Sequence, residues 1–145
     1  MRLAAPKHSL PFKEFACSGV YFLHNGGAVV YVGQATNMMR RIGTHLFDGV
    51  KVFDGMSAIP CSVETMGRWE RFFIGILLPK YNQCSHSIEI RHMIERGQDH
   101  GAICAMVGRP PRSDIPRVAE MLGVSQQDMR WRPGDKHSLE MAISG

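Results

Sequence analysis

The chain lacks the features that mark disulfide-rich, zinc-binding or membrane-spanning proteins. Its four cysteines, Cys17, Cys61, Cys84 and Cys104, include no C-x-x-C pair, which argues against a structural zinc site and against a disulfide framework. No apolar run reaches the roughly 20 residues that cross a membrane, and prolines and lysines interrupt the first part of the chain. We therefore expect a cytoplasmic protein with reduced thiols and no membrane partner.

A large excess of charge of one sign is also missing. The sequence has 17 Lys and Arg against 13 Asp and Glu, a formal net charge of +4. This mild excess suits a nucleic-acid partner but is too small to identify one. The 145 residues, of which 44% are hydrophobic, suffice for one domain with a buried core and an appendage.

What the sequence does contain is a β-hairpin signal. Residues 20–23 and 28–32 are rich in β-branched and aromatic side chains, and Asn25-Gly26-Gly27 between them supplies the positive φ angles of a tight turn. Tyr21 and Tyr31 lie at corresponding distances from that turn, so they can end up near each other. The register stays open, because a slip of one residue reverses the face of every side chain.

A helix is predicted after the hairpin. Thr36 or Asn37 is a good N-cap, and the helix should run to about residue 45 or 47. Met38, Ile42 and Leu46 recur at i, i+4 and i+8, which predicts that they form its buried face.

Two polar side chains lie on an adjacent face of this predicted helix. Arg41 and His45 are one turn apart. Arg41 has no acidic residue three or four positions away in either direction. Its charge must therefore be met by water, by a distant partner or by an anion.

A second amphipathic helix is predicted further along the chain and should end before Pro79. Its apolar stripe consists of Trp69, Phe72, Phe73, Ile76 and Leu77. Glu70 lies at the edge of the stripe, with no basic residue one turn away, which makes it a reasonable ligand for Mg²⁺. Taken alone, Glu70 is better explained as a solvated helix glutamate, since most surface glutamates have no special role.

In order and spacing these residues resemble the GIY-YIG nuclease superfamily. Gly19-Val20-Tyr21 matches the first half of the name motif and Tyr31-Val32-Gly33 the second, each with valine where isoleucine is usual. The predicted helix then carries Asn37, Arg41 and His45 where the family has its asparagine, arginine and histidine. The segment from Glu70 to Asn82, with Phe73 and Pro79 between them, matches the third motif.

The resemblance covers about residues 15–84 and implies an α+β fold, with a small three-stranded antiparallel sheet flanked by helices and a third strand within residues 57–62. It divides the chain into a catalytic domain at 13–84 and a mainly helical extension at 85–145. It also implies hydrolysis of DNA phosphodiester bonds with one Mg²⁺ or Mn²⁺ ion.

The resemblance further implies a role for each matched residue. Tyr21 would act as general base or orient the attacking water, and Tyr31 would hold Tyr21 or the phosphate. Arg41 would bind the scissile phosphate, for which its planar, always charged guanidinium is well suited, and His45 would take or relay a proton. The remaining assignments are Glu70 to the metal, Asn82 to a hydrogen bond within the site, Gly19, Gly33 and Asn37 to structural positions, and Arg40 to a further DNA contact.

The C-terminal part gives weaker signals. Residues 86–96 look helical, 108–112 read as a basic connector, and 118–129 are similar to a helix-turn-helix motif. In such a motif residues 125–132 would form the helix that enters the major groove, with Arg130 and Arg132 as candidate DNA contacts. The same Leu-Gly-Val-Ser turn also closes helix pairs that bind nothing, and the two interpretations have about equal weight.

Three functions remain from sequence. The first is a metal-dependent DNA endonuclease of restriction, phage or mobile-element type, and the second is a structure-selective repair or recombination nuclease. The third is a DNA-binding regulator without activity, against which the intact set of Tyr21, Arg41, Glu70 and Asn82 argues. One active site per chain means that double-strand cutting would require a dimer or two sequential nicks.

Overall fold

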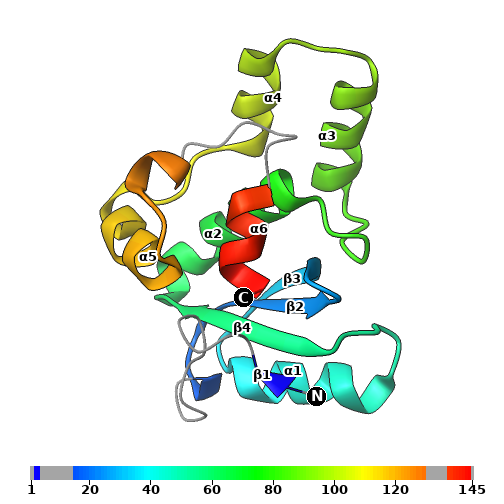
Figure 1. Cartoon of the computed structure of the whole chain (residues 1–145), viewed down its shortest axis with the longest axis vertical. Coiled ribbons are helices and arrows are strands. Elements are labelled where there is room, and N and C mark those ends of the chain that lie inside the picture. Colours follow the sequence, from blue (N-terminus) through cyan, green and yellow to red (C-terminus); the bar gives the residue numbers. More distant parts are fainter. Residues whose placement is uncertain (1, 4–14, 130–136, 145) are drawn as a thin grey trace.

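The computed structural model describes residues 2–3, 15–129 and 137–144, which form an α+β fold (Figure 1). The elements, in chain order, are β1 (Arg2–Leu3), β2 (Gly19–Asn25), β3 (Ala28–Ala35), α1 (Met38–Asp48), β4 (Gly55–Pro60), α2 (Val63–Leu77), α3 (Ser85–Glu95), α4 (His100–Val107), the 3₁₀ helix η2 (Arg112–Asp114), α5 (Ile115–Leu122), the 3₁₀ helix η3 (Gln126–Met129) and α6 (His137–Ser144).

The sheet has the strand order β1-β4-β2-β3. β2 pairs antiparallel with both β3 and β4, so the predicted three-stranded antiparallel sheet is confirmed. The short β1 adds a parallel pairing at the outer edge of β4, which the sequence did not indicate. β4 begins at Gly55, slightly before the range expected for the third strand.

The hairpin register decides how the two tyrosines meet. Tyr21 pairs with Gly33 and Leu23 pairs with Tyr31, and a β-bulge follows between Leu23 and His24. Tyr21 and Tyr31 are therefore diagonal neighbours on one face of the sheet, with their ring centroids 6.1 Å apart.

Helices cover both faces of the sheet. α1 lies against one face, and α2 and α6 lie against the other (Figure 1). The larger apolar cluster joins the sheet to α2 and continues into α3, α4, α5 and α6. A smaller cluster, which includes Tyr21, Leu23, Met38 and Ile42, lies between the sheet and α1.

The predicted first helix forms, and Asn37 is its N-cap: the Asn37 side chain accepts a hydrogen bond from the Arg40 N–H at 3.1 Å. Met38 and Ile42 are buried as expected, but the prediction for Leu46 is wrong, since its side chain is 50% exposed. The buried position in the last turn is occupied by His45, which is only 4% exposed. Leu46 follows one residue later around the helix and therefore points toward solvent.

The second helix carries the predicted apolar stripe to its end at Leu77. Its C-cap residue Leu78 has a left-handed backbone, with φ of 46°, immediately before Pro79. This turn redirects the chain so that Asn82 returns to the free edge of β3, where the Tyr81 N–H donates to the Val30 carbonyl at 3.0 Å.

The C-terminal segment is mainly helical, and its helices pack onto the sheet side that α2 covers. α6 contacts β3 and β4, and the Ser57 hydroxyl donates to the Ile143 carbonyl at 3.1 Å. No helix in the described ranges is long and apolar enough to cross a membrane.

The predicted helix-turn-helix is only partly visible. α5 ends at Leu122 with Gly123 in the left-handed region, as the motif requires. However, residues 126–129 form a 3₁₀ helix rather than the start of the expected α-helix at 125–132. Arg130 and Arg132 lie outside the described residues.

Candidate active site

A buried hydrogen bond joins Tyr21 on β2 to His45 on α1. The Tyr21 Oη and the His45 Nε2 are 2.8 Å apart, and both residues are almost fully buried. His45 Nδ1 is also buried and has no hydrogen-bond partner within the described residues. Which atom donates the proton depends on the tautomer of the imidazole.

Glycine at two positions makes room for this arrangement. The ring of Tyr21 lies directly over Gly33, so a Cβ atom at position 33 would collide with it. A Cβ at Gly19 would meet the Ile59 carbonyl and the end of the Met38 side chain. Both glycines of the matched motifs therefore allow close approaches within the sheet and under α1.

Burial keeps both members of the pair neutral near pH 7. It raises the pKa of Tyr21 far above its ordinary value of 10.0; the neighbouring Tyr31 adds to this, and Arg41 opposes it. Burial also lowers the pKa of His45, with further lowering by the positive charges of Lys51 and Arg41. The site thus holds a protonated phenol against a neutral imidazole, not a free phenolate.

Tyr31 completes an aromatic group with the pair. Its ring centroid is 5.1 Å from that of His45, and the Nζ atom of Lys51 lies 4.7 Å from the same tyrosine ring. Burial raises the pKa of Tyr31, and the negative charge of Glu70 raises it further. Lys51 was not predicted, because only the folding of the loop before β4 brings it here.

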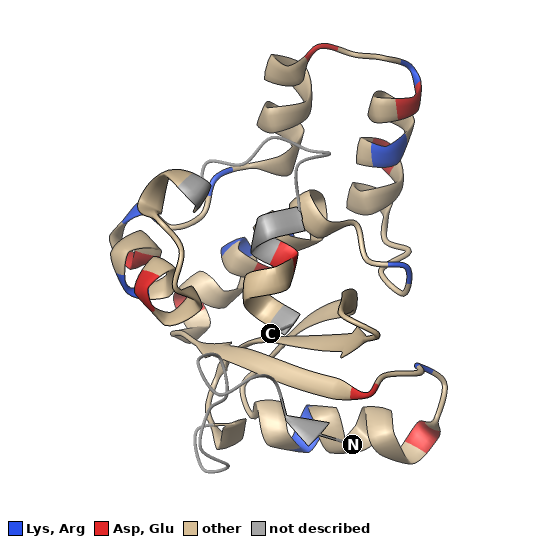
Figure 2. Cartoon of the chain, viewed as in Figure 1, with Lys and Arg blue, Asp and Glu red and all other residues tan. Residues whose placement is uncertain are grey.

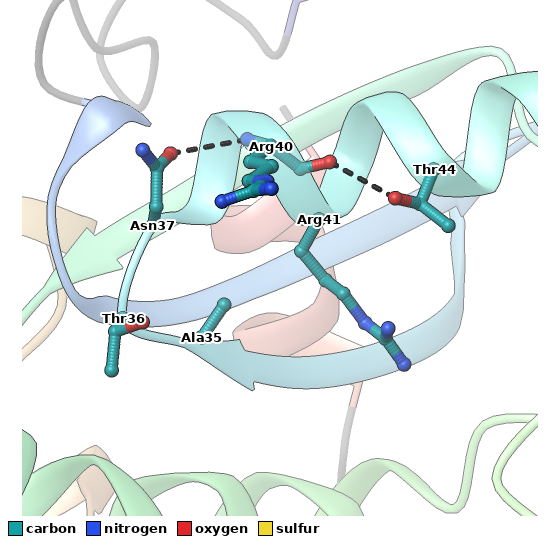
Figure 3. A pocket seen from close by; sticks show the side chains of 6 residues that line it. All are labelled: Ala35, Thr36, Asn37, Arg40, Arg41 and Thr44. Atoms are coloured by element: carbon teal, nitrogen blue, oxygen red, sulfur yellow. Dashed lines mark hydrogen bonds between the residues drawn. The ribbon is translucent and has the colours of Figure 1, made fainter.

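Arg41 reaches into an open pocket at the start of α1. The pocket measures about 250 Å³ and is lined by Ala35, Thr36, Asn37, Arg40, Arg41 and Thr44. Arg40 lies beside Asn37, while the Arg41 side chain extends away from it (Figure 3). Among the described residues neither arginine forms a salt bridge. Arg41 hydrogen-bonds to the hydroxyls of Tyr21 and Tyr31, but the positive charge of neither guanidinium is paired with a carboxylate, so both can attract an anion.

Figure 2 shows how the charged residues are distributed along α1. The basic residues, coloured blue, lie in the N-terminal half of the helix, and the acidic residue, coloured red, lies at its C-terminal end. No acidic residue lines the pocket. An anion is therefore favoured at the first turn, where the positive end of the helix dipole also lies.

Glu70, on α2, contacts β3, the edge strand that also carries Tyr31. The Gln34 Nε2 donates a hydrogen bond to Glu70 Oε1 at 3.2 Å. Partial burial raises the pKa of Glu70, and the bond from Gln34 lowers it. Gln34 was not predicted as a site residue. Its position next to Gly33 near the end of β3, together with the alternation of side chains along a strand, could have indicated it.

A single carboxylate fits only certain metals. No group of three or more His, Cys, Asp or Glu side chains gathers in the described part of the chain. Mg²⁺ takes one or two protein carboxylates and completes its shell with water and phosphate oxygens. Glu70, half-buried and without a salt bridge among the described residues, matches that demand.

Asn82 behaves like a short strand beside β3. Its Oδ1 accepts a hydrogen bond from the Val32 N–H and its Nδ2 donates to the Val32 carbonyl, both at 2.9 Å. These two bonds hold the strand segment between Tyr31 and Gly33. Asn82 therefore supports the site through the backbone.

The turn that carries Asn82 is held in place by α3. The Ser87 hydroxyl donates to the Asn82 carbonyl at 2.5 Å. The Arg91 guanidinium donates to the carbonyls of Leu78 and Pro79, at 2.6 and 3.1 Å. Neither contact was predicted, because both depend on how α3 packs beside the end of α2.

Tyr21, Tyr31, Arg41, His45, Glu70 and Asn82, all predicted for the site, thus come together from separate elements, while Arg130 and Arg132 lie outside the described residues. Comparison with known proteins adds no relative: no family model, no curated protein and no solved structure matches the chain. Any functional conclusion therefore depends on the residues and their geometry.

Proposed function

We propose that the protein is a divalent-metal-dependent DNA endonuclease of the GIY-YIG type. The observation that carries the proposal is the gathering of Tyr21, Tyr31, Arg41, His45 and Glu70 around one edge strand, β3, from four different elements. This set combines phosphate binding, proton transfer and metal binding, which phosphodiester hydrolysis requires together.

Arg41 would bind the scissile phosphate. It lies in an open pocket that has no acidic lining, and its charge acts on both tyrosines. A guanidinium can bind two phosphate oxygens at once and stabilise the negative charge that develops on them. Lys51, over the Tyr31 ring, places a second cation beside the same position.

Tyr21 and His45 would remove the proton of the attacking water as a relay. A free Tyr21 phenolate is disfavoured by burial, which raises the pKa of that phenol. If Tyr21 passes its own proton to His45 Nε2 while its oxygen takes the proton of the water, the phenolate is never isolated. The new bond joins the water oxygen to phosphorus, the bond to the leaving oxygen breaks, and that oxygen takes a proton from solvent.

Glu70 would hold the ion, with Gln34 orienting the carboxylate. Bound there, a Mg²⁺ or Mn²⁺ ion supplies a Lewis acid that stabilises the leaving oxygen and the crowded phosphorus centre. Asn82 would keep β3, and so Tyr31, in register with the rest of the site.

The test is incubation of purified protein with supercoiled, linear and branched DNA, with Mg²⁺ or Mn²⁺ and with chelator. We expect cleavage only with metal, and a loss of at least about a hundredfold in Arg41→Ala, because one preorganised charge contact commonly contributes that much. Arg41→Lys is the matched control: it keeps the charge and should recover only part of the rate, since it cannot bind two oxygens.

The proposal fails if the wild-type protein leaves all three DNAs intact with metal present. It also fails if Arg41→Ala cuts at the wild-type rate. Circular dichroism of each variant shows that the loss is not due to unfolding.

A further inference from the structure

An apolar patch lies exposed where α1 ends and the chain turns toward β4. Phe47 is 94% exposed, and Leu46, Val50 and Val52 are 50%, 70% and 61% exposed. Single exposed apolar side chains are ordinary on a protein surface, but a group of them more often marks a contact surface. We call the surface formed by Phe47, Val50 and Val52 the apolar tip.

The apolar tip is fixed next to the candidate active site. Between its two valines, Lys51 reaches back to the Tyr31 ring at 4.7 Å. The Val52 N–H donates to the Tyr81 hydroxyl at 3.1 Å, and the Val50 N–H donates to Asp48 at 3.0 Å. The Val52–Tyr81 bond and the contact of Lys51 with Tyr31 hold the loop beside the candidate active site.

Phe47 also continues a line of side chains on α1. Arg40, Thr44 and Phe47 lie at i, i+4 and i+7, which places them along one exposed face of the helix. The first two line the pocket that contains Arg41. At 1.5 Å per residue Phe47 is about 10 Å further along the helix axis, the length of about three stacked nucleotides at 3.4 Å each.

We propose that the apolar tip, with Phe47 as its centre, binds an unstacked base of the DNA strand whose phosphate occupies the Arg40–Arg41 pocket. The inference rests on the proposed nuclease function and specifies its substrate. Aromatic side chains stack on bases of any sequence, and apolar wedges hold base steps open. DNA with an unpaired base near the cut should therefore be preferred, because a paired base must first be unstacked at a cost.

The surroundings of the tip favour nucleic acid over a protein partner. Stable protein interfaces cover about 800 Å² on each partner, far more than three side chains at the end of a helix provide. Three cations, Arg40, Arg41 and Lys51, lie on the site side of the tip. Asp48, at the end of α1, and Asp54, in the loop that follows, each accept a hydrogen bond from a backbone N–H, of Val50 and of Gly26 respectively.

The experiment measures binding by fluorescence anisotropy in chelator, so that no DNA is cut. The probes are a matched duplex and the same duplex with one unpaired adenine. We expect wild-type protein to prefer the second probe, Phe47→Ala to reduce that preference about five- to fiftyfold, and Phe47→Trp to retain it. Ile94→Ala, a change at another exposed apolar side chain on α3, is the matched control and should change nothing.

Two results would overturn the inference: equal affinity of wild-type protein for both probes, or an unchanged preference in Phe47→Ala. A Phe47→Ala protein that keeps its preference but changes from dimer to monomer in light scattering would instead identify the tip as a self-association surface. Cleavage is measured separately with Mg²⁺. Wild-type protein that prefers the unpaired base through Phe47 but cuts no DNA would reject the nuclease and keep the binding site.

Discussion

Both faces of the central sheet bury apolar side chains, but the α1 side also buries the hydrogen bond between Tyr21 and His45. On the α2 side Val20 and Phe22 enter an apolar cluster, where Phe22 meets Phe73 edge to face at 5.0 Å. On the α1 side the intervening Tyr21 is equally buried but carries a hydroxyl that must bond to His45. Three consecutive residues of one strand thus serve a dry core on one side and a buried polar site on the other.

This difference separates stability from chemistry. Burial of the apolar side chains on the α2 side stabilises the fold, and these side chains need no hydrogen-bond partner. Burial of Tyr21, His45 and Glu70 instead opposes their charged forms and displaces their pKa values. The α1 side and the edge of β3 therefore give up some stability, and this arrangement is typical of sites that carry out reactions.

The difference between the two faces predicts that substitutions of neighbouring residues on β2 have different effects. Phe22→Ala should have the largest effect on stability. It leaves a cavity between the sheet and α2 and should lower the free energy of unfolding by about 3–5 kcal/mol. Urea denaturation measures this directly. A loss below about 1 kcal/mol would mean that this face is not the main core.

The other half of the same test is Tyr21→Phe. It removes the hydroxyl and leaves His45 Nε2 without its bond, for a stability loss of about 1 kcal/mol. The relay is lost at the same time, so DNA cleavage should fall by about 10²–10⁴-fold. Cleavage at the wild-type rate in Tyr21→Phe would reject the relay and leave the phenol a packing role.

Much of the fold was predictable because its signals are local. The turn at Gly26-Gly27, the Asn37 cap and the apolar stripe ending before Pro79 each depend on residues close in sequence, and each is present. The conformation of such segments follows from backbone geometry and helix periodicity, which operate over one or two turns of chain.

The parts that were missed depend on contacts between distant segments. Leu46 was expected inside, but α1 presents His45 to the sheet at that level. The bulge after Leu23 and the return of Lys51 over Tyr31 have no local signature. Arg91 supports the turn that carries Asn82 only because α3 packs beside it.

The smallest predicted effect concerns the pH dependence of the free energy of unfolding. Burial lowers the pKa of His45 below 6.5, so the unfolded chain binds more protons than the folded one between that lowered value and 6.5. The free energy of unfolding should therefore fall slightly as the pH is lowered through this window. His45→Gln should remove this part of the acid sensitivity, and denaturation curves that fall in parallel for both proteins would contradict it.

The most direct test of the account is cleavage of supercoiled DNA by wild-type protein and Glu70→Gln in Mg²⁺. Because burial raises the pKa of the Glu70 carboxyl, the neutral amide should fold at least as stably as the wild type. We predict metal-dependent cutting by the wild type and a loss of at least about a hundredfold in Glu70→Gln, with an unchanged or slightly higher melting temperature. Equal cutting by Glu70→Gln, or cutting by the wild type in chelator, would contradict a site that depends on a metal held by Glu70.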